Sequence, residues 1–222
     1  MVRARSDADT LIAMSHSARP GSGEHELLID YRSPDGERVH AVRSTLIASS
    51  IATLKELGYY DRYLELLPPE HHERILLTLA PEWLPIAIGE AHYRACDGVG
   101  LSDAELEKLG EVVSVRIMGT FLGTLVRTSG QNLGATPWVP LAKYDLLWSR
   151  VMQGGRCTVE RVGPKDVVIK SYGNPLFETR YFRIAYHGVV RGALGMFSSR
   201  IMGRTVRMPD APDAVITSIS WV

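Results

Sequence analysis

The amino-acid sequence predicts an α+β fold, and two observations carry this prediction. Segments with helical periodicity fill much of the first half of the chain, and a hairpin, a helix and a second hairpin follow toward the C-terminus. Strands grouped in hairpins, rather than alternating singly with helices, are typical of an antiparallel sheet flanked by helices. We therefore expect a helical N-terminal block followed by such a sheet.

Length and composition set the expected number of domains. The chain has 222 residues, of which 45% are hydrophobic. This is enough for one sizeable core, whereas two domains would each be small. Residues 1–24 carry charges before any apolar run and end in a Gly-Ser stretch. We therefore expect a disordered tail over residues 1–24 and a single ligand-binding or regulatory domain over residues 25–222.

The first predicted element is a hairpin. Glu26 to Arg32 and Glu37 to Val42 flank the turn Ser33 to Gly36, which has the Asp-Gly sequence of tight turns. An apolar helical stripe then begins at Ser44, the expected N-cap, and ends at Gly58. The same periodicity predicts three further helices, at residues 61–67, 70–79 and 81–95, the last ending at the Asp-Gly turn 97–98.

The longest predicted helix opens with a capping box, in which Ser102 precedes Glu105 by three residues, and it runs to about Thr128. Glycines at 130 and 134 indicate a loop after it. The remaining predicted elements are an aromatic-rich helix at 138–152, a hairpin of strands 157–162 and 167–172, a helix at 178–199, and a last hairpin of strands 204–208 and 214–222.

Two pairs of glycines at helical spacing are the most informative local feature. Gly119 and Gly123 fall within the longest predicted helix, and Gly188 and Gly192 fall within the last one. Glycine inside a helix costs about 1 kcal/mol relative to alanine. The pairs therefore predict that another backbone or a ligand closely approaches each helix.

Charge and cysteine content disfavour several classes of protein. Lys plus Arg and Asp plus Glu number 25 each, so no net field concentrates phosphates or anionic lipids at the surface. No apolar stretch has the length of a signal peptide or a bilayer span. Cys96 and Cys157 fit neither a disulfide framework nor paired zinc ligands. We therefore expect a cytoplasmic protein with no nucleic-acid or membrane partner.

Several local motifs resemble a known group of proteins. They are Val42-Arg43-Ser44-Thr45-Leu46, Leu67-Pro68-Pro69-Glu70, Pro81-Glu82-Trp83-Leu84-Pro85 and the end Ile219-Ser220-Trp221. From Val42 to Val222 the chain resembles an uncharacterised bacterial family that is similar to 4-vinyl-reductase-type domains and, more remotely, to haem-NO-binding domains and TRAPP trafficking subunits. The resemblance implies an often dimeric α+β sensor or regulatory domain with a hydrophobic small-molecule pocket.

Two departures from these relatives bear on cofactors. The 4-vinyl-reductase-type sensors use a cysteine-rich metal site near the C-terminal hairpin, whereas residues 204–222 contain no cysteine. Haem-NO-binding domains use a helix-borne histidine and a Tyr-x-Ser-x-Arg motif for the haem propionates, and the nearest string here, Trp148-Ser149-Arg150, differs from that motif. We therefore expect no metal site and no cofactor, haem included.

Motifs of catalytic chemistry are missing from the sequence. It contains no Gly-x-Ser-x-Gly or Walker string and no Gly-x-Gly-x-x-Gly after a predicted strand. Cys96 and Cys157 fit buried small hydrophobic residues better than nucleophiles. His71 and His72 follow a helix start and fit a solvated helix face. We therefore expect no enzymatic activity and assign no catalytic residue.

The candidate pocket residues are four aromatics and one histidine. Phe121 on the long helix and Trp138, Tyr144 and Trp148 on the next supply apolar area beside a glycine-bearing surface. Ordinary core packing is the alternative interpretation of these rings. His92 lies beside an apolar stripe, where neutral imidazole is able to ligate a metal or haem iron. A buried histidine that is hydrogen-bonded by the protein is the plainer interpretation.

Together these observations predict a non-catalytic sensory or regulatory domain that binds a small apolar molecule and acts as a homodimer, with a regulatory protein as a further partner. Ligand binding would favour one arrangement of the two glycine-bearing helices. Two alternatives stay open. One is a structural adaptor subunit without a ligand, and the other is a haem- or metal-binding sensor that uses His92.

Overall fold

The computed structural model describes residues 25–78, 81–129 and 136–222, and the side chains at 118, 120–123 and 125–129 fall outside this description. Its helices and antiparallel strands confirm the predicted α+β class. The expected tail over residues 1–24 and most of the loop expected after Thr128 lie outside the described residues. The division into a tail and one domain therefore stays a prediction.

Antiparallel strands form two sheets. The larger has five strands in the order β1-β5-β6-β8-β7, and a small one has the order β3-β2-β4. The strands of the larger sheet are β1 (Glu26–Arg32), β5 (Arg156–Gly163), β6 (Asp166–Tyr172), β7 (Ile201–Met208) and β8 (Ala211–Trp221). Those of the smaller are β2 (Ala41–Arg43), β3 (Trp83–Pro85) and β4 (Met152–Gln153).

Helices make up the rest of the described fold. The N-terminal ones are α2 (Ser44–Glu56), α3 (Tyr60–Leu66), η1 (Pro69–His71), α4 (His72–Leu76) and α5 (Ile86–Val99). They are followed by α6 (Asp103–Ser129), α7 (Trp138–Leu141), α8 (Tyr144–Ser149), η2 (Pro175–Glu178) and α9 (Arg180–Gly195).

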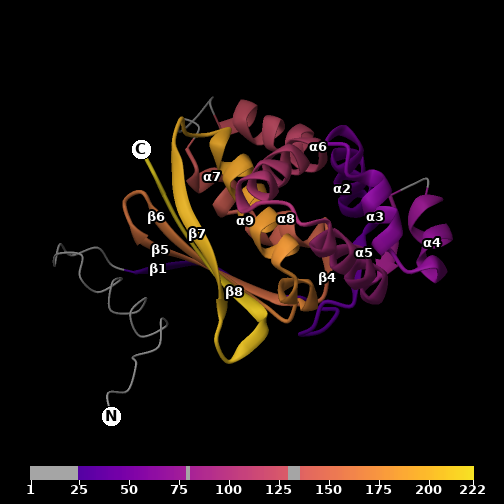
Figure 1. Ribbon diagram of the computed structural model, residues 1–222. Coiled ribbons are helices and arrows are strands. Elements are labelled where there is room, and N and C mark those ends of the chain that lie inside the picture. The colour runs from indigo at the N-terminus through magenta and orange to yellow at the C-terminus, as the bar shows by residue number, and fades with distance from the viewer. Residues whose placement is uncertain (1–24, 79–80, 130–135) are drawn as a thin grey trace, which may run out of the picture.

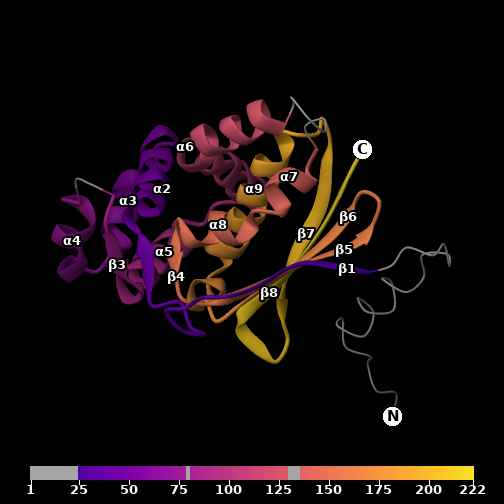
Figure 2. The ribbon, with the colours of Figure 1, turned by 180° about the vertical axis from the view of Figure 1, so that it is seen from behind.

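The helices gather on one side of the five-stranded sheet (Figure 1). Helix α9 packs on β7 and also along α6, so that it lies between the sheet and the longest helix. Helices α2 to α5 lie farther from the sheet, as the view from behind also shows (Figure 2). The layers thus run from the sheet through α9 to the N-terminal helical block.

Alternation along the strands explains which face of the sheet is covered. In β6 every second residue is buried, namely Val167, Ile169 and Ser171. Side chains alternate between the two faces of a strand, so these residues share the face that meets the helices. Helix α9 is amphipathic and buries Phe182, Ala185 and other residues at helical spacing.

The cleanest local signals of the sequence are confirmed. At the start of α6 the Ser102 N–H donates to Glu105 Oε2 at 2.8 Å, and the Glu105 N–H donates to Ser102 Oγ at 3.3 Å. This is the reciprocal bonding of a capping box. The two C-terminal hairpins form as predicted, with β5 paired to β6 and β7 paired to β8.

The predicted N-terminal hairpin is wrong, although its turn forms. The Gly36 N–H donates to Ser33 O at 3.3 Å, and Gly36 has a φ of 117°. Strand β1 nevertheless pairs with β5, with Glu26 opposite Arg161. The segment after the turn finds distant partners instead, because the His40 N–H donates to the Gln153 carbonyl and β2 pairs with β3 and β4.

The predicted capping role of Ser44 is also wrong. Helix α2 does begin at this residue, but Ser44 Oγ accepts a hydrogen bond from the Glu82 N–H at 3.0 Å. The side chain therefore connects α2 to the segment that leads into β3. The hydroxyl's partner is supplied by a residue far away in the sequence, which local spacing does not reveal.

Three predicted helices have different bounds in the structure. Residues 83–85 form β3, and α5 begins only at Ile86, because a proline at 85 disfavours helical backbone at the residue before it. Helix α5 then continues past 97–98 to Gly100, which ends it with a φ of 84°. The helix predicted at 138–152 is divided into α7, α8 and β4, and the one predicted at 70–79 consists of η1 and α4.

Candidate functional site

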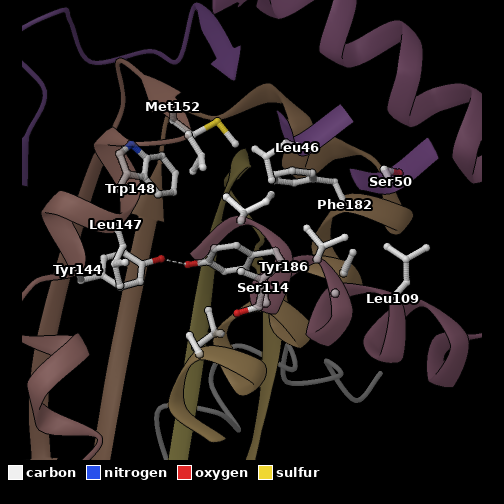
Figure 3. A pocket seen from close by; sticks show the side chains of 18 of the residues that line it. Leu46, Ser50, Leu109, Ser114, Tyr144, Leu147, Trp148, Met152, Phe182 and Tyr186 are labelled. Atoms are coloured by element: carbon white, nitrogen blue, oxygen red, sulfur yellow. Dashed lines mark hydrogen bonds between the residues drawn. The ribbon is translucent and has the colours of Figure 1, made fainter. Parts of the chain in front are cut away.

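An apolar cavity of about 90 Å³ lies in the helical layer between α6, α8 and α9 (Figure 3). Helices α2, α5 and α7 contribute further lining residues, and Val151 and Met152 complete it on the side of β4. None of the described lining residues is Asp, Glu, Lys, Arg, His or Cys. The cavity therefore suits a neutral and mainly apolar molecule.

Helix α6 presents one face to the cavity. Gly110, Val113, Ser114 and Ile117 all line it, at intervals of three and four residues. Residues at this spacing lie on the same side of a helix. Gly110 leaves α6 without a side chain where α9 comes near, and Ser114 places a hydroxyl among apolar walls.

Helices α8 and α9 supply the aromatic part of the lining. Tyr144 and Trp148, one turn apart on α8, face Phe182 and Tyr186, one turn apart on α9. The Trp148 indole donates its N–H to the Gly154 carbonyl at 3.1 Å, which fixes the plane of the ring. These rings provide large and rigid apolar walls.

A buried chain of hydroxyl groups closes the cavity toward the sheet. The Tyr144 and Tyr186 hydroxyls share a hydrogen bond, and the Tyr186 hydroxyl also shares one with Ser171 Oγ at 3.1 Å. Burial raises the pKa of Tyr186 to about 12 and raises the pKa of Tyr144 well above its usual range. Both phenols are therefore neutral at physiological pH.

The sequence-predicted glycines occupy different surroundings. A Cβ at Gly188 would lie 2.1 Å from the Glu107 carbonyl oxygen, and a Cβ at Gly192 would lie 3.0 Å from Glu111 Cα, so both glycines face the backbone of α6. At Gly119 the nearest described atom to such a Cβ is Val115 Cγ1, on the same helix at 3.8 Å. The surroundings of Gly123 lie outside the described residues.

The sequence-predicted pocket residues also separate. Tyr144 and Trp148 line the cavity. Trp138 does not, because its ring packs on Trp221 with centroids 4.6 Å apart and its indole N–H donates to the Pro164 carbonyl. The side chain of Phe121 lies outside the described residues.

His92 is fully buried on α5 and is not among the described lining residues, although its ring packs edge-on against Tyr93, which is one of them, with centroids 4.7 Å apart. Its Nδ1 shares a hydrogen bond with the Tyr63 hydroxyl at 2.8 Å, and its Nε2 lies 3.6 Å from Cys96 Sγ. Burial lowers the pKa of His92 to about 3, so the imidazole is neutral. Both ring nitrogens thus contact protein atoms. Among the residues that the structure describes, no three His, Cys, Asp or Glu side chains gather as a metal site would require.

Sequence reasoning did not single out Gly110, Ser114 or Tyr186 as site residues. A glycine and a serine four residues apart within an apolar helical stripe are the signal that could have pointed to the first two. Tyr186 has no comparable signal, because an aromatic residue on an amphipathic helix is usually ordinary core.

In the described part of the chain, no helix is long and apolar enough to cross a membrane.

Comparison with known proteins yields structural likeness only. No family model matches the sequence, and no curated protein is significantly similar to it. One solved chain, from work on the modulation of haem redox potential through protein-induced porphyrin distortion, superposes with a TM-score of 0.52 at 13% identity, over 81% of this chain and 99% of that one. A second, from work on haem distortion in the H-NOX family, gives a TM-score of 0.51 at 13% identity, over 80% and 94%.

These likenesses show that the fold is that of the H-NOX chains, which is the haem-NO-binding part of the expected resemblance. They also correct the expectation that haem is no candidate cofactor, because both solved chains come from studies of haem. That expectation rested on a missing Tyr-x-Ser-x-Arg string, and a fold is able to persist where a local motif does not. Similarity to 4-vinyl-reductase-type domains and to TRAPP subunits stays a prediction.

Proposed function

We propose that this chain is a non-catalytic sensory or regulatory domain that binds a small apolar molecule in the cavity between α6, α8 and α9. The observation that supports it most is the cavity itself, which is lined by aromatic and aliphatic side chains of the described fold and by no described charged residue. The likeness in fold to haem-binding solved chains adds support, since the same architecture serves there to enclose a ligand.

The size of the cavity bears on the mechanism. Its volume of about 90 Å³ is smaller than the engineered cavity of about 150 Å³ that holds benzene in another protein. A ligand of a few carbon atoms fits as the walls stand, and a larger one has to move them apart. We therefore propose that ligand binding displaces α6 relative to α8 and α9.

The proposed output is a change at an interface of the protein. A ligand shifts such an equilibrium only by its difference in affinity for the two arrangements. Helix α6 is tied to α9 by the Arg191 guanidinium, which pairs with Glu107 at 2.6 Å and Glu111 at 3.4 Å. A movement of α6 would therefore alter this exposed edge. We propose a homodimer as the form that reads out the change, which sedimentation with and without ligand would test.

Haem is the second candidate ligand, and the likeness in fold favours it. In the described conformation the residues do not yet fit it. Ligand pockets of drug-sized molecules measure about 300–1,000 Å³, and this cavity is about 90 Å³. Four phenols, of Tyr93, Tyr144, Tyr181 and Tyr186, and the Met152 thioether are the described lining groups of a kind that can bind iron, and no described cation lines the cavity to pair with propionates.

The proposed function is tested by titrating toluene into the protein and its variants, with calorimetry as the measurement. Val113→Phe fills the cavity, whereas Val115→Phe places the same ring on the same helix at a position that is 59% exposed. We expect saturable binding to the wild type and to Val115→Phe, and at least tenfold weaker binding to Val113→Phe. Equal binding to all three proteins, or none to the wild type, would contradict the proposal.

Haem is tested separately by adding haemin to the purified protein and recording its absorbance in the Soret region. A Soret band that saturates at one haem per protein and is lost in Tyr144→Phe or Tyr186→Phe would show that the ligand of this cavity is haem and not the proposed apolar molecule. Mass spectrometry of a native extract would show any molecule that co-purifies. A protein that is empty and binds neither probe would favour the adaptor alternative.

A further inference from the structure

Ser114 carries a fully buried polar atom in the described cavity lining that has no hydrogen-bond partner. It lies on α6, its side chain is 1% exposed, and its Oγ makes no hydrogen bond to any described residue. A serine inside a helix commonly donates to the carbonyl one turn before it, so its hydroxyl is usually satisfied. An unpaired buried hydroxyl is costly and therefore calls for an explanation.

Most of the other polar side chains around the cavity differ from Ser114 in this respect. Ser50 Oγ shares a hydrogen bond with the Tyr181 hydroxyl at 2.7 Å, and the Trp148 indole is bonded to a carbonyl. Tyr144 and Tyr186 are bonded to each other, as the dashed line in Figure 3 marks. In that view Ser114 projects among the lining side chains below the tyrosine pair. The hydroxyl of Ser114 is therefore free to meet a ligand.

The surroundings restrict what such a ligand carries. No described charged side chain lines the cavity, so an ionised group would be buried without a counter-charge, which is strongly unfavourable. Apolar side chains form nearly all of the walls, so further polar groups on the ligand would lose their hydrogen bonds to water. A single neutral oxygen near Ser114 meets both restrictions.

A trapped water is a weaker explanation for the hydroxyl. Buried waters usually make about three hydrogen bonds. Ser114 Oγ is the one fully buried side-chain oxygen or nitrogen without a partner among the described residues around this cavity, since the other two such atoms are on the sheet, at Arg156 and Arg161. A water held by one hydroxyl among apolar walls is more easily displaced than one in a complete polar cage.

We infer that the ligand is a neutral, mainly apolar molecule with a single oxygen, such as an alcohol, a phenol or a ketone, and that Ser114 Oγ hydrogen-bonds to this oxygen. The inference rests on the proposed function, because it assigns the chemical class of the molecule that fills the same cavity. Ser114 orients the ligand, and the apolar walls supply the contact area. The site discriminates between molecules of equal size by the presence of the oxygen.

Phenol and toluene test this inference, because they have nearly the same shape and differ in a hydroxyl against a methyl group. Calorimetric titration of the wild type should show phenol bound at least as tightly as toluene. In Ser114→Ala the affinity for toluene should stay within about threefold, whereas the affinity for phenol should fall at least tenfold. The inference would be overturned if both proteins bound toluene more tightly than phenol and the ratio of the two affinities were the same in the wild type and in Ser114→Ala.

One control variant keeps the result specific. Tyr144→Phe removes the hydroxyl of a neighbouring tyrosine but leaves Ser114, so this variant should still bind phenol in preference to toluene. If the preference for phenol were lost in Tyr144→Phe and kept in Ser114→Ala, the tyrosine pair would recognise the oxygen and the role of Ser114 would be overturned. If the wild type binds neither probe, the proposed function itself fails. If toluene binds and phenol is rejected, only the present inference fails.

The stability of the empty protein gives a readout that is independent of binding. The change from serine to alanine replaces an unpaired buried hydroxyl by a hydrogen atom, which removes an unfavourable desolvation and improves helix propensity. Ser114→Ala should therefore raise the urea midpoint of the ligand-free protein. A clear fall in that midpoint would mean that the hydroxyl already has a partner, and it too would overturn the inference.

Discussion

Gly110 on α6 and Gly188 on α9 face each other where the two helices pack. A Cβ at Gly110 would lie 2.9 Å from Gly188 Cα, and a Cβ at Gly188 would lie 3.0 Å from Gly110 Cα. Each such Cβ would lie still closer to a carbonyl oxygen of the opposite helix, at 2.0 Å from Ala185 and 2.1 Å from Glu107. Two absent side chains thus allow the backbones to touch beside the cavity.

This contact predicts that even the addition of one methyl group at Gly188 strongly destabilises the protein. Gly188→Ala should lower the free energy of unfolding by more than about 3 kcal/mol, because the methyl group meets backbone atoms that do not move unless the helices separate. Gly195→Ala, at the end of the same helix with no described atom within 4 Å of a Cβ, should be neutral or gain up to about 1 kcal/mol. Urea denaturation of both variants measures the difference. Equal stabilities would refute the close contact.

The hydrogen bond between Tyr144 and Tyr186 predicts that loss of either hydroxyl lowers the free energy of unfolding, and that loss of the Tyr186 hydroxyl lowers it more. Tyr144→Phe should cost about 1 kcal/mol, because Tyr186 keeps its bond to Ser171. Tyr186→Phe should cost more, about 2 kcal/mol, because it leaves both Tyr144 and the fully buried Ser171 without this partner. The double variant should cost less than the two single costs added. Denaturation of the three variants measures the coupling, and strict additivity would show that the hydroxyls do not interact.

The burial of His92 predicts how stability depends on pH. Its pKa is lowered from 6.5 to about 3, so between these values the unfolded chain binds a proton that the folded chain does not. The free energy of unfolding should therefore fall as the pH decreases below 6.5, by up to about 1.4 kcal/mol per pH unit. Burial lowers the pKa of His187 as well, which adds to the slope in the same direction.

Variants separate the contribution of His92 from the rest. His92→Gln should flatten the slope between pH 6.5 and pH 5, a range above the usual pKa values of carboxylates. Tyr63→Phe removes the partner of Nδ1 but leaves the buried imidazole, so it should lower stability and keep the slope. Urea denaturation at several pH values is the measurement. An unchanged slope in His92→Gln would contradict a neutral, buried histidine.

The start of α9 predicts a role for Asp97 of α5. Its carboxylate accepts hydrogen bonds from the Arg180 N–H at 3.0 Å and the Tyr181 N–H at 2.5 Å, which lie in the first turn of α9. Asp97→Ala should cost about 1–2 kcal/mol, since it leaves these donors unpaired and removes a negative charge from the positive end of the helix. Thermal denaturation is a suitable measurement. Glu90→Ala is the control, because its exposed pair with Arg94 at 3.8 Å should contribute under about 0.5 kcal/mol.

The sequence predicted those elements whose causes are local. The capping box of α6 and the two C-terminal hairpins depend on residues within a few positions of each other, and they form as expected. The same holds for α9, whose apolar stripe gives the correct helix to within a few residues. Local chemistry is sufficient for such elements, because the partners of each group lie in the same short segment.

Elements whose partners lie far away were not predicted. The segment around β2 has the alternation and the turn of a hairpin, but its hydrogen bonds go to β3 and β4. Ser44 has the position of an N-cap, but its hydroxyl bonds to residue 82. In both cases a single sequence shows which groups need partners and does not show which distant residues supply them.

The candidate site follows the same rule. Tyr144 and Trp148 were named from their aromatic character, and both line the cavity, whereas Trp138 packs on Trp221. Periodicity places all three on the same predicted helix and cannot separate them, since the break between α7 and α8 rotates one ring away from the others. The unpaired hydroxyl of Ser114 becomes visible only when its neighbours are known in space.

The pairing of β1 with β5 has a consequence for how the protein is made. Glu26 pairs with Arg161, so a nascent chain carries its first strand without a partner while every segment from α2 to α8 leaves the ribosome. Contacts between such distant segments form late, and an unpaired strand is a template for neighbouring chains until they do. Strand β1 is therefore synthesised well before β5 and pairs late, so the fold is most exposed to aggregation while its nascent chains are still incomplete.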